Sequence, residues 1–156
     1  QLEDGDVDGM WTYVVEPALQ EFAALPFEEI CREFVKEQQK KNLLPFRYQK
    51  MGRWYGKTTV RNIKGEKGMT VAETEIDLLA IGADGKEYMV GECKFKKVPF
   101  SYSEYLNTVA KLAPLKENVT FYYLLFSACG FDDKIENAAM EDDTLRLYDL
   151  ETIVKG

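Results

Sequence analysis

The chain has 156 residues, of which 46% are hydrophobic and 13% aromatic, as is typical of one globular domain with a real core and not of a disordered chain. It contains no histidine, which excludes Ser-His-Asp triads, Cys-His dyads and imidazole metal ligands. The net charge of −7 argues against a generally basic nucleic-acid-binding surface, because affinity for phosphate backbones comes largely from Lys and Arg.

The charges are unevenly distributed along the sequence. Residues 36–67 carry ten basic and two acidic side chains. This segment predicts either a local electropositive surface or an ordinary solvated helix end and loop. Both interpretations stay open at this point.

The cysteines and the hydropathy indicate a cytoplasmic protein. Cys31, Cys93 and Cys129 are scattered and form no C-x-x-C pair, which favours buried thiols in a reducing compartment and not a zinc site. No apolar run approaches the roughly 20 residues that cross a bilayer, so we expect no transmembrane span.

The N-terminal part divides into a connector and the start of the domain. Residues 1–25 are expected to be a linker that carries a helical segment over 11–24, and residues 26–156 the domain itself. After Pro26, apolar residues recur at helical spacing, which predicts a helix over 27–40 with one face toward the core. The residues of that face are Phe27, Ile30, Cys31, Phe34 and Val35.

The segment M-G-R-W-Y-G-K in the basic region allows two interpretations. It is either a strand that delivers Trp54 to the core, with Arg53 and Lys57 outside, or a surface on which nucleic acid stacks and its phosphates bind. Arg53 and Lys57 are therefore candidate nucleic-acid contacts.

Residues 75–95 read as two strands, E-I-D-L-L-A-I and K-E-Y-M-V-G-E-C-K-F, joined by an Asp-Gly dipeptide that suits a two-residue hairpin turn. With that turn, Asp77 lies opposite Glu92, and Glu75 lies opposite Lys94. Two carboxylates and a lysine would then share one face of otherwise apolar strands. Such a cluster does not stabilise a sheet, which points to function.

The C-terminal half continues an α/β pattern. Ser103 is expected to cap a helix whose apolar face comprises Tyr105, Leu106, Val109 and Leu112. The run V-T-F-Y-Y-L-L-F-S predicts a central strand buried on both faces. A short helix over 131–140 and a last strand that reaches Ile153 and Val154 complete a mixed α/β domain with a largely covered sheet.

The cluster on the hairpin suits metal chemistry. Two close carboxylates repel each other unless a cation lies between them. Mg²⁺ binds one or two carboxylates together with carbonyls, waters and phosphate oxygens. Lys94 could orient or help deprotonate a water and stabilise charge on a phosphate.

The motifs A-L-P-F-E-E-I-C-R-E-F, M-G-R-W-Y-G-K, E-I-D-L-L-A-I and G-E-C-K-F occur in this order and resemble the PD-(D/E)xK nuclease superfamily. Within it they resemble the C-terminal domain of unknown function that follows the P-loop ATPase domain of archaeal and bacterial DEXX-box ATPases. The resemblance spans about residues 15–150. It implies a mixed central sheet flanked by helices with a restriction-endonuclease-like core.

The resemblance also implies roles for single residues. Asp77 and Glu92 would bind Mg²⁺ or Mn²⁺ together with the backbone carbonyl of Cys93, Lys94 would be the catalytic lysine, and Glu28 the helix glutamate that faces the site. Glu75 is the alternative partner of Lys94, which would make that lysine part of a structural ion pair. The chain departs from the superfamily pattern in having Ile76 before Asp77 where the name-giving proline stands.

The leading hypothesis is a Mg²⁺-dependent DNA phosphodiesterase domain that is governed by an ATPase domain in cis. This chain itself does not contain the G-x-x-x-x-G-K-[ST] motif of such an ATPase domain. The first alternative is an inactive nuclease-like module that binds DNA or regulates the ATPase. The second is a structural scaffold with an incidental polar hairpin, which is disfavoured because buried unpaired charges are costly.

Overall fold

The computed structural model describes residues 26–61, 69–113 and 118–156, and of the side chains between residues 56 and 74 it describes none. The helical segment expected within residues 1–25 lies outside these ranges. One five-stranded mixed sheet has the order β1-β2-β3-β4-β5, with antiparallel pairing up to β3 and parallel pairing from β3 to β5. The strands are β1 (Tyr48–Arg61), β2 (Met69–Gly82), β3 (Glu87–Lys94), β4 (Thr120–Ser127) and β5 (Leu145–Asp149).

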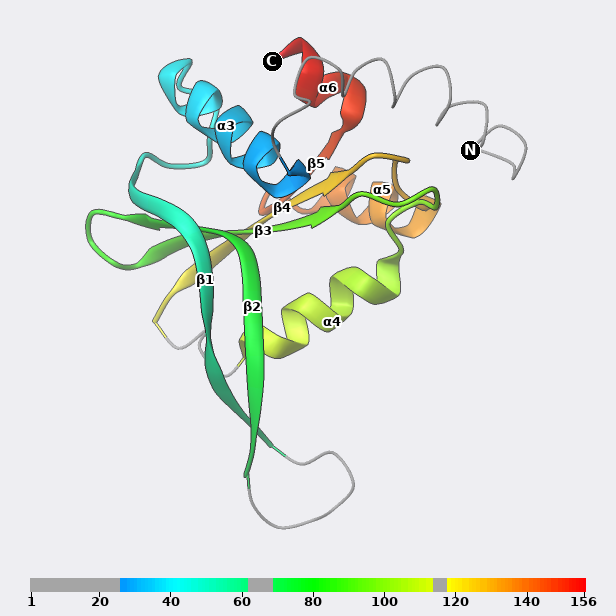
Figure 1. Ribbon diagram of the computed structural model, residues 1–156. Helices are drawn as coiled ribbons and strands as arrows, with labels where there is room; N and C mark the ends of the chain where they lie inside the picture. Colours follow the sequence, from blue (N-terminus) through cyan, green and yellow to red (C-terminus); the bar gives the residue numbers. More distant parts are fainter. Residues whose placement is uncertain (1–25, 62–68, 114–117) are drawn as a thin grey trace.

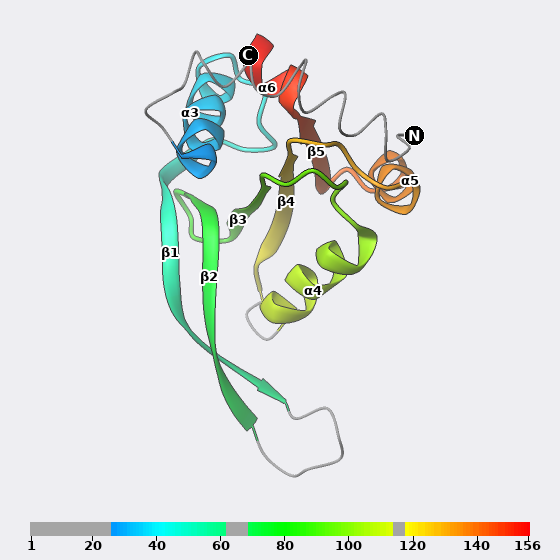
Figure 2. The same ribbon diagram turned by 45° about the vertical axis from the view of Figure 1, so that its right-hand side comes forward.

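Helices cover both faces of this sheet (Figures 1 and 2). One face carries α3 (Phe27–Lys40) and α6 (Leu150–Lys155), and the other carries α4 (Tyr102–Leu112) and α5 (Asp133–Glu141). The expected α/β fold, a mixed central sheet flanked by helices, is therefore confirmed. In the described part of the chain, no helix is long and apolar enough to cross a membrane.

The helix α3 forms as its sequence predicts. Pro26 precedes it in extended conformation, and Glu28 and Glu29 lie in the first turn, where their charges favour the helix dipole. All five residues of the expected apolar face are buried. They pack with β2, β3, β4 and α6 in one core cluster.

The strand β4 is the central strand that its apolar run predicts. It lies between β3 and β5. All of its side chains are buried except those of Thr120, which is exposed, and Tyr122, which is half-buried. Its side chains divide between the two faces: Leu124 and Phe126 pack toward α3, and Tyr123 and Leu125 toward α4.

The second face is bordered by α4, whose expected cap was wrong by two residues. Ser101, not Ser103, is the N-cap, and it forms a capping box with Glu104. Tyr105 and Leu112 are buried, but Leu106 is 45% exposed and does not belong to the core face. With Ser101 as the cap, Glu104 lies in the first turn of α4.

Two expectations near the chain's C-terminal end need correction. The short helix α5 begins at Asp133, two residues later than expected. Asp132 caps it, because its carboxylate accepts a hydrogen bond from the Ile135 N–H. The last strand stops at Asp149 and does not include Ile153 and Val154, because the Asp149 side chain caps the helix α6 that contains them.

The hairpin β2–β3 has the expected register but a longer turn. Leu78 pairs with Gly91 and Ile81 with Tyr88, as the expected register requires. The strands end at Gly82 and Glu87, so the connection has four residues and not two. The Gly85 N–H donates to the Gly82 carbonyl, and Gly85 takes a positive φ of 70°.

A β-bulge interrupts β2 on its other side. Gly52 of β1 pairs with Leu79 and Trp54 with Ile76, so one residue of β1 lies opposite the two residues Asp77 and Leu78. Bulges bend a strand and re-aim its side chains. Accordingly, Leu78 packs in the cluster beneath α3 while Ile76 packs in the cluster beside α4.

Candidate active site

The bulge places the carboxylate of Asp77 against the main chain of β3. The recorded β2–β3 ladder ends at Leu78 and Gly91. Beyond it, the Cys93 N–H donates to Oδ2 of Asp77 at 2.9 Å, where an uninterrupted ladder would offer a main-chain carbonyl. The Asp77 carbonyl accepts from the Arg32 guanidinium at 2.8 Å. Asp77 is thus held from both β3 and α3.

Asp77 and Glu92 are neighbours, and each carboxyl group affects the pKa of the other. Burial, followed by the charge of Asp77, raises the pKa of Glu92 to about 7 against an opposing effect of Lys111. Burial also raises the pKa of Asp77; the Cys93 N–H opposes this rise, and the charge of Glu28 adds to it. At neutral pH Glu92 is therefore only partly ionised, and the two carboxyl groups do not carry two full charges.

Alternation along β3 separates the side chains of the motif. Glu92 and Lys94 point to the α4 face, while the Cys93 thiol points to the α3 face and lies against the Cys31 thiol. The Lys94 carbonyl accepts from the Ala128 N–H, so it faces β4. Since the N–H and C=O of one strand residue point to the same edge, the Cys93 carbonyl faces the Asp77 edge.

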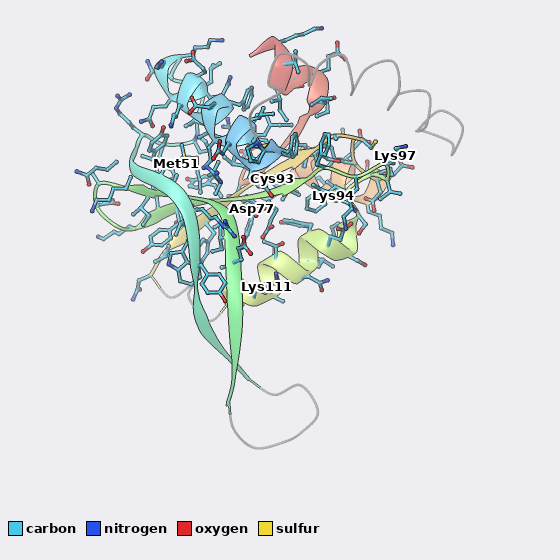
Figure 3. All side chains as sticks on the ribbon, in the orientation of Figure 1. Met51, Asp77, Cys93, Lys94, Lys97 and Lys111 are labelled. Carbon is cyan, nitrogen blue, oxygen red and sulfur yellow. The ribbon has the colours of Figure 1, made fainter. Side chains whose placement is uncertain are left out.

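Glu92 opens into a cavity of about 610 Å³ between the end of β3, the start of α3 and α4. Figure 3 shows Asp77 where β2 and β3 separate, with Lys94 and Lys111 on the side of the sheet that carries α4. Glu28 of α3 lines the same cavity. The polar residues of the lining are Glu28, Glu92, Lys94, Lys96, Glu104, Asn107, Thr108 and Lys111.

Lys94 is held by α4 and not by the partner expected from the hairpin. Its ammonium donates to Oε1 of Glu104 at 2.5 Å and to the Pro99 carbonyl at 3.2 Å. Its side chain is only 11% exposed. Burial opposes ionisation of Glu104, but the hydrogen bonds from Lys94 and Ser101 lower the pKa of this carboxyl.

Glu75, the expected alternative partner of Lys94, pairs with Arg53 on the neighbouring strand instead. Arg53 is exposed, and Trp54 beside it is half-buried against the second core cluster. The strand interpretation of this segment is therefore confirmed for Trp54. Lys57 lies in β1, but its side chain falls outside the described residues.

The cavity residues that sequence reasoning missed include Glu104, Asn107 and Lys111. They recur every three to four residues along α4 and therefore lie on one face of that helix. The pattern S-x-x-E at 101–104 was a readable signal, because a capping box places its glutamate in the first turn of a helix. A cap at Ser103 leaves this role of Glu104 out.

The donor set suits a hard divalent cation. Two opposed, half-buried carboxylates and a main-chain carbonyl at the same edge are oxygen ligands of the kind that Mg²⁺ and Mn²⁺ bind. In the described part of the chain there is no group of three or more His, Cys, Asp or Glu side chains placed to hold a metal ion. The remaining ligands would therefore be waters and substrate oxygens, as is usual for Mg²⁺.

Comparisons with known proteins give the following matches. The family model DUF234, described as archaeal and bacterial proteins of unknown function, matches residues 1–108. The uncharacterized protein MJECL04 of Methanocaldococcus jannaschii is 33% identical over 76 residues, which are 49% of this chain and 14% of that protein.

Two solved structures are also similar. A protein of unknown function, AF1548, aligns with a TM-score of 0.44 and 17% identity over 81% of this chain and 65% of its own. A repair endonuclease from Pyrococcus abyssi aligns with a TM-score of 0.42 and 12% identity over 80% of this chain and 47% of its own. The chain spans less than two thirds of each of these three relatives.

Proposed function

The chain belongs to the DUF234 family of archaeal and bacterial proteins of unknown function, and we propose that within it this domain is a Mg²⁺- or Mn²⁺-dependent DNA phosphodiesterase. The observation that carries the proposal is the pairing of Asp77 with Glu92 beside a cavity lined by lysines. Nothing in sheet packing explains two half-buried carboxylates in contact, since burying such a pair costs free energy.

In this proposal Asp77, Glu92 and the Cys93 carbonyl hold the metal. A bound divalent ion would supply Lewis-acid activation of a water and of a phosphate oxygen. Glu92 would give up its proton when the ion binds, because a cation between two carboxylates removes their repulsion. Glu28, across the cavity, would accept a hydrogen bond from the attacking water.

A lysine of the cavity that is not held in an ion pair would offset the negative charge of the phosphate. Lys94 is the lysine of the motif, and it can reach a phosphate only by leaving Glu104. Lys111 has no ion-pair partner among the described residues. Both lysines line the cavity that contains Glu92.

Cleavage assays with matched variants test the proposal. The chain should cut linear, supercoiled or branched DNA with Mg²⁺ or Mn²⁺, and Asp77→Asn and Glu92→Gln should each lower the rate by more than about 100-fold. Asn at position 77 keeps an oxygen that accepts from Cys93, so thermal unfolding should show a folded variant. Equal cutting by the variants, or no cutting by the unaltered chain, would refute the phosphodiesterase.

A second candidate function is an inactive nuclease-like module that binds DNA or regulates an ATPase domain in cis. The observation that favours it is the closed ion pair between Lys94 and Glu104, which occupies the motif lysine. Calorimetry separates the two: the phosphodiesterase binds Mn²⁺ at millimolar concentration with loss of the signal in Glu92→Gln, and the module gives no heat.

The ATPase partner also remains a proposal. It rests on the sequence resemblance and on the length of the Methanocaldococcus relative, of which the matching segment is only 14%. Co-expression with the proposed ATPase domain, followed by measurement of ATP hydrolysis with and without DNA, tests it. ATP turnover that is independent of this domain and of DNA would argue against such a partner.

A further inference from the structure

Lys94, Lys96 and Lys111 line the cavity, and Lys94 differs from Lys111 in what its ammonium contacts. Lys94 is largely buried and uses its ammonium on Glu104 and the Pro99 carbonyl. The same ammonium lies 5.8 Å from the centroid of the Phe100 ring, a distance that allows a cation–π interaction. Lys94 is therefore already surrounded by partners.

Glu104 also has several hydrogen-bond partners besides Lys94. Its Oε1 also accepts from the Ser101 N–H at 3.1 Å and from the Ser101 hydroxyl at 3.0 Å. The carboxylate thus joins the end of β3 to the first turn of α4. Releasing Lys94 toward a substrate would break this ion pair and leave a carboxylate without its cation, which is costly for partly buried charges.

Lys111 has the opposite character. It lies two helical turns after Glu104 on the same face of α4, is exposed, and lines the cavity together with Asn107. In the described part of the chain it takes part in no ion pair and no side-chain hydrogen bond. An exposed ammonium and an amide on one helix face, beside a carboxylate pair, offer donors to an anion that approaches that pair.

We infer that Lys111, together with Asn107, binds a backbone phosphate of the nucleic acid in this cavity, and that Lys94 serves as a structural ion pair. The inference rests on the proposed function for the choice of a phosphodiester as ligand. It assigns the phosphate contact to α4, away from the lysine of the sequence motif. The same geometry gives Lys94 the task of fixing α4 against β3.

DNA binding measured without cleavage tests this assignment. A fluorescent duplex is titrated with the full chain in Ca²⁺ buffer between about 50 and 200 mM salt, and the anisotropy gives the affinity at each concentration. Lys111→Met should weaken binding several-fold and lower the slope of log affinity against log salt by about one. Lys111→Arg keeps the charge and should restore both.

Matched controls separate charge from stability. Lys86→Met removes an exposed lysine of the β2–β3 loop, remote from α4 (Figure 1), and should leave the slope unchanged. Lys94→Met should lower the melting temperature, whereas Lys111→Met should not. If Lys94→Met fails to fold, the double variant Lys94→Met/Glu104→Leu removes both partners and should bind DNA as the unaltered chain does.

Three outcomes would overturn the inference: no duplex binding by the unaltered chain, an unchanged salt slope in Lys111→Met, or a slope lowered by about one in the Lys94 double variant. The cleavage assay is scored separately. If no DNA is cut but Lys111→Met lowers the salt slope by about one, the inference stands and the phosphodiesterase fails. If DNA is cut equally well by Lys111→Met with unchanged binding, the phosphodiesterase stands and the inference fails.

Discussion

The two faces of the central sheet are built from the same strands but enclose different chemistry. Beneath α3 and α6, β3 and β4 contribute Met89, Leu124 and Phe126 to a core of aromatic and aliphatic side chains. On the face of α4, the end of β3 contributes Glu92 and Lys94 to a polar cavity. The α4 face also has a core cluster of its own, so the difference lies at the end of β3, where charged side chains replace apolar ones.

The largest expected effect comes from the apolar face. The ring of Phe34 lies 5.1 Å from that of Tyr148 and 6.3 Å from that of Phe126, measured between centroids. Phe34→Ala should lower the free energy of unfolding by about 3–5 kcal/mol, because it leaves a cavity in the core. Urea denaturation measures the change. Leu106→Ala, at an exposed position of α4, should shift it by less than about 0.5 kcal/mol.

Equal losses in these two variants would show that Leu106 packs as tightly as Phe34 and belongs to the core face of α4.

The effect of Glu92 on the free energy of unfolding should depend on pH. The folded chain raises the pKa of Glu92 from 4.5 to about 7, so it binds this proton more tightly than the unfolded chain does. The contribution of Glu92 to stability is therefore fully present below pH 4.5 and is lost as the pH rises to about 7, by about 3 kcal/mol in all.

Glu92→Gln cannot ionise and should abolish this decline. Urea denaturation from about pH 5 to 8 measures both slopes. An identical pH dependence in the variant and the unaltered chain would contradict the raised pKa of Glu92. A stability of the unaltered chain that does not change with pH would place Glu92 in solvent.

A smaller effect is expected where the two faces share β3. An added Cβ on Gly91 would lie 2.9 Å from Cβ of Leu78 and 3.3 Å from Cε1 of Phe126. Gly91→Ala should therefore destabilise the fold by about 1–3 kcal/mol through overpacking. Gly52, across the bulge, has open space around its missing Cβ, so Gly52→Ala should cost much less.

Thermal unfolding of the two glycine variants gives this comparison directly. A stability of Gly91→Ala as high as that of Gly52→Ala would mean that β2 and β3 separate more easily than their close contact indicates.

Much of the fold could be predicted from the sequence because local patterns determine it. The apolar stripe of α3 and the continuous apolar run of β4 each have one good solution. The register of β2 and β3 was predicted from the Asp-Gly turn between them, and a shift by one residue would turn every side chain to the wrong face. It held although the turn was two residues longer than expected.

The site was only partly predictable, because its decisive contacts are between distant elements. The bulge at Asp77 arises from pairing with β1, whose sequence gave only a weak strand pattern. The partner of Lys94 could be found only with the correct helix cap, since Ser101 directs Glu104 toward the end of β3. Spacing in the sequence placed Glu75 opposite Lys94, but the bulge in β2 and the pairing with Arg53 give it another partner.

The hydrogen bond from Cys93 to Asp77 bears on how relatives should be compared. The side chain at position 77 replaces a main-chain acceptor, so a relative without any chemistry would still need an oxygen there to keep β3 in place. Glu92 makes no hydrogen bond to the main chain in the described part of the chain. Asp or Asn at position 77 is thus expected as a mark of the fold, and an acid at position 92 as a mark of the proposed activity.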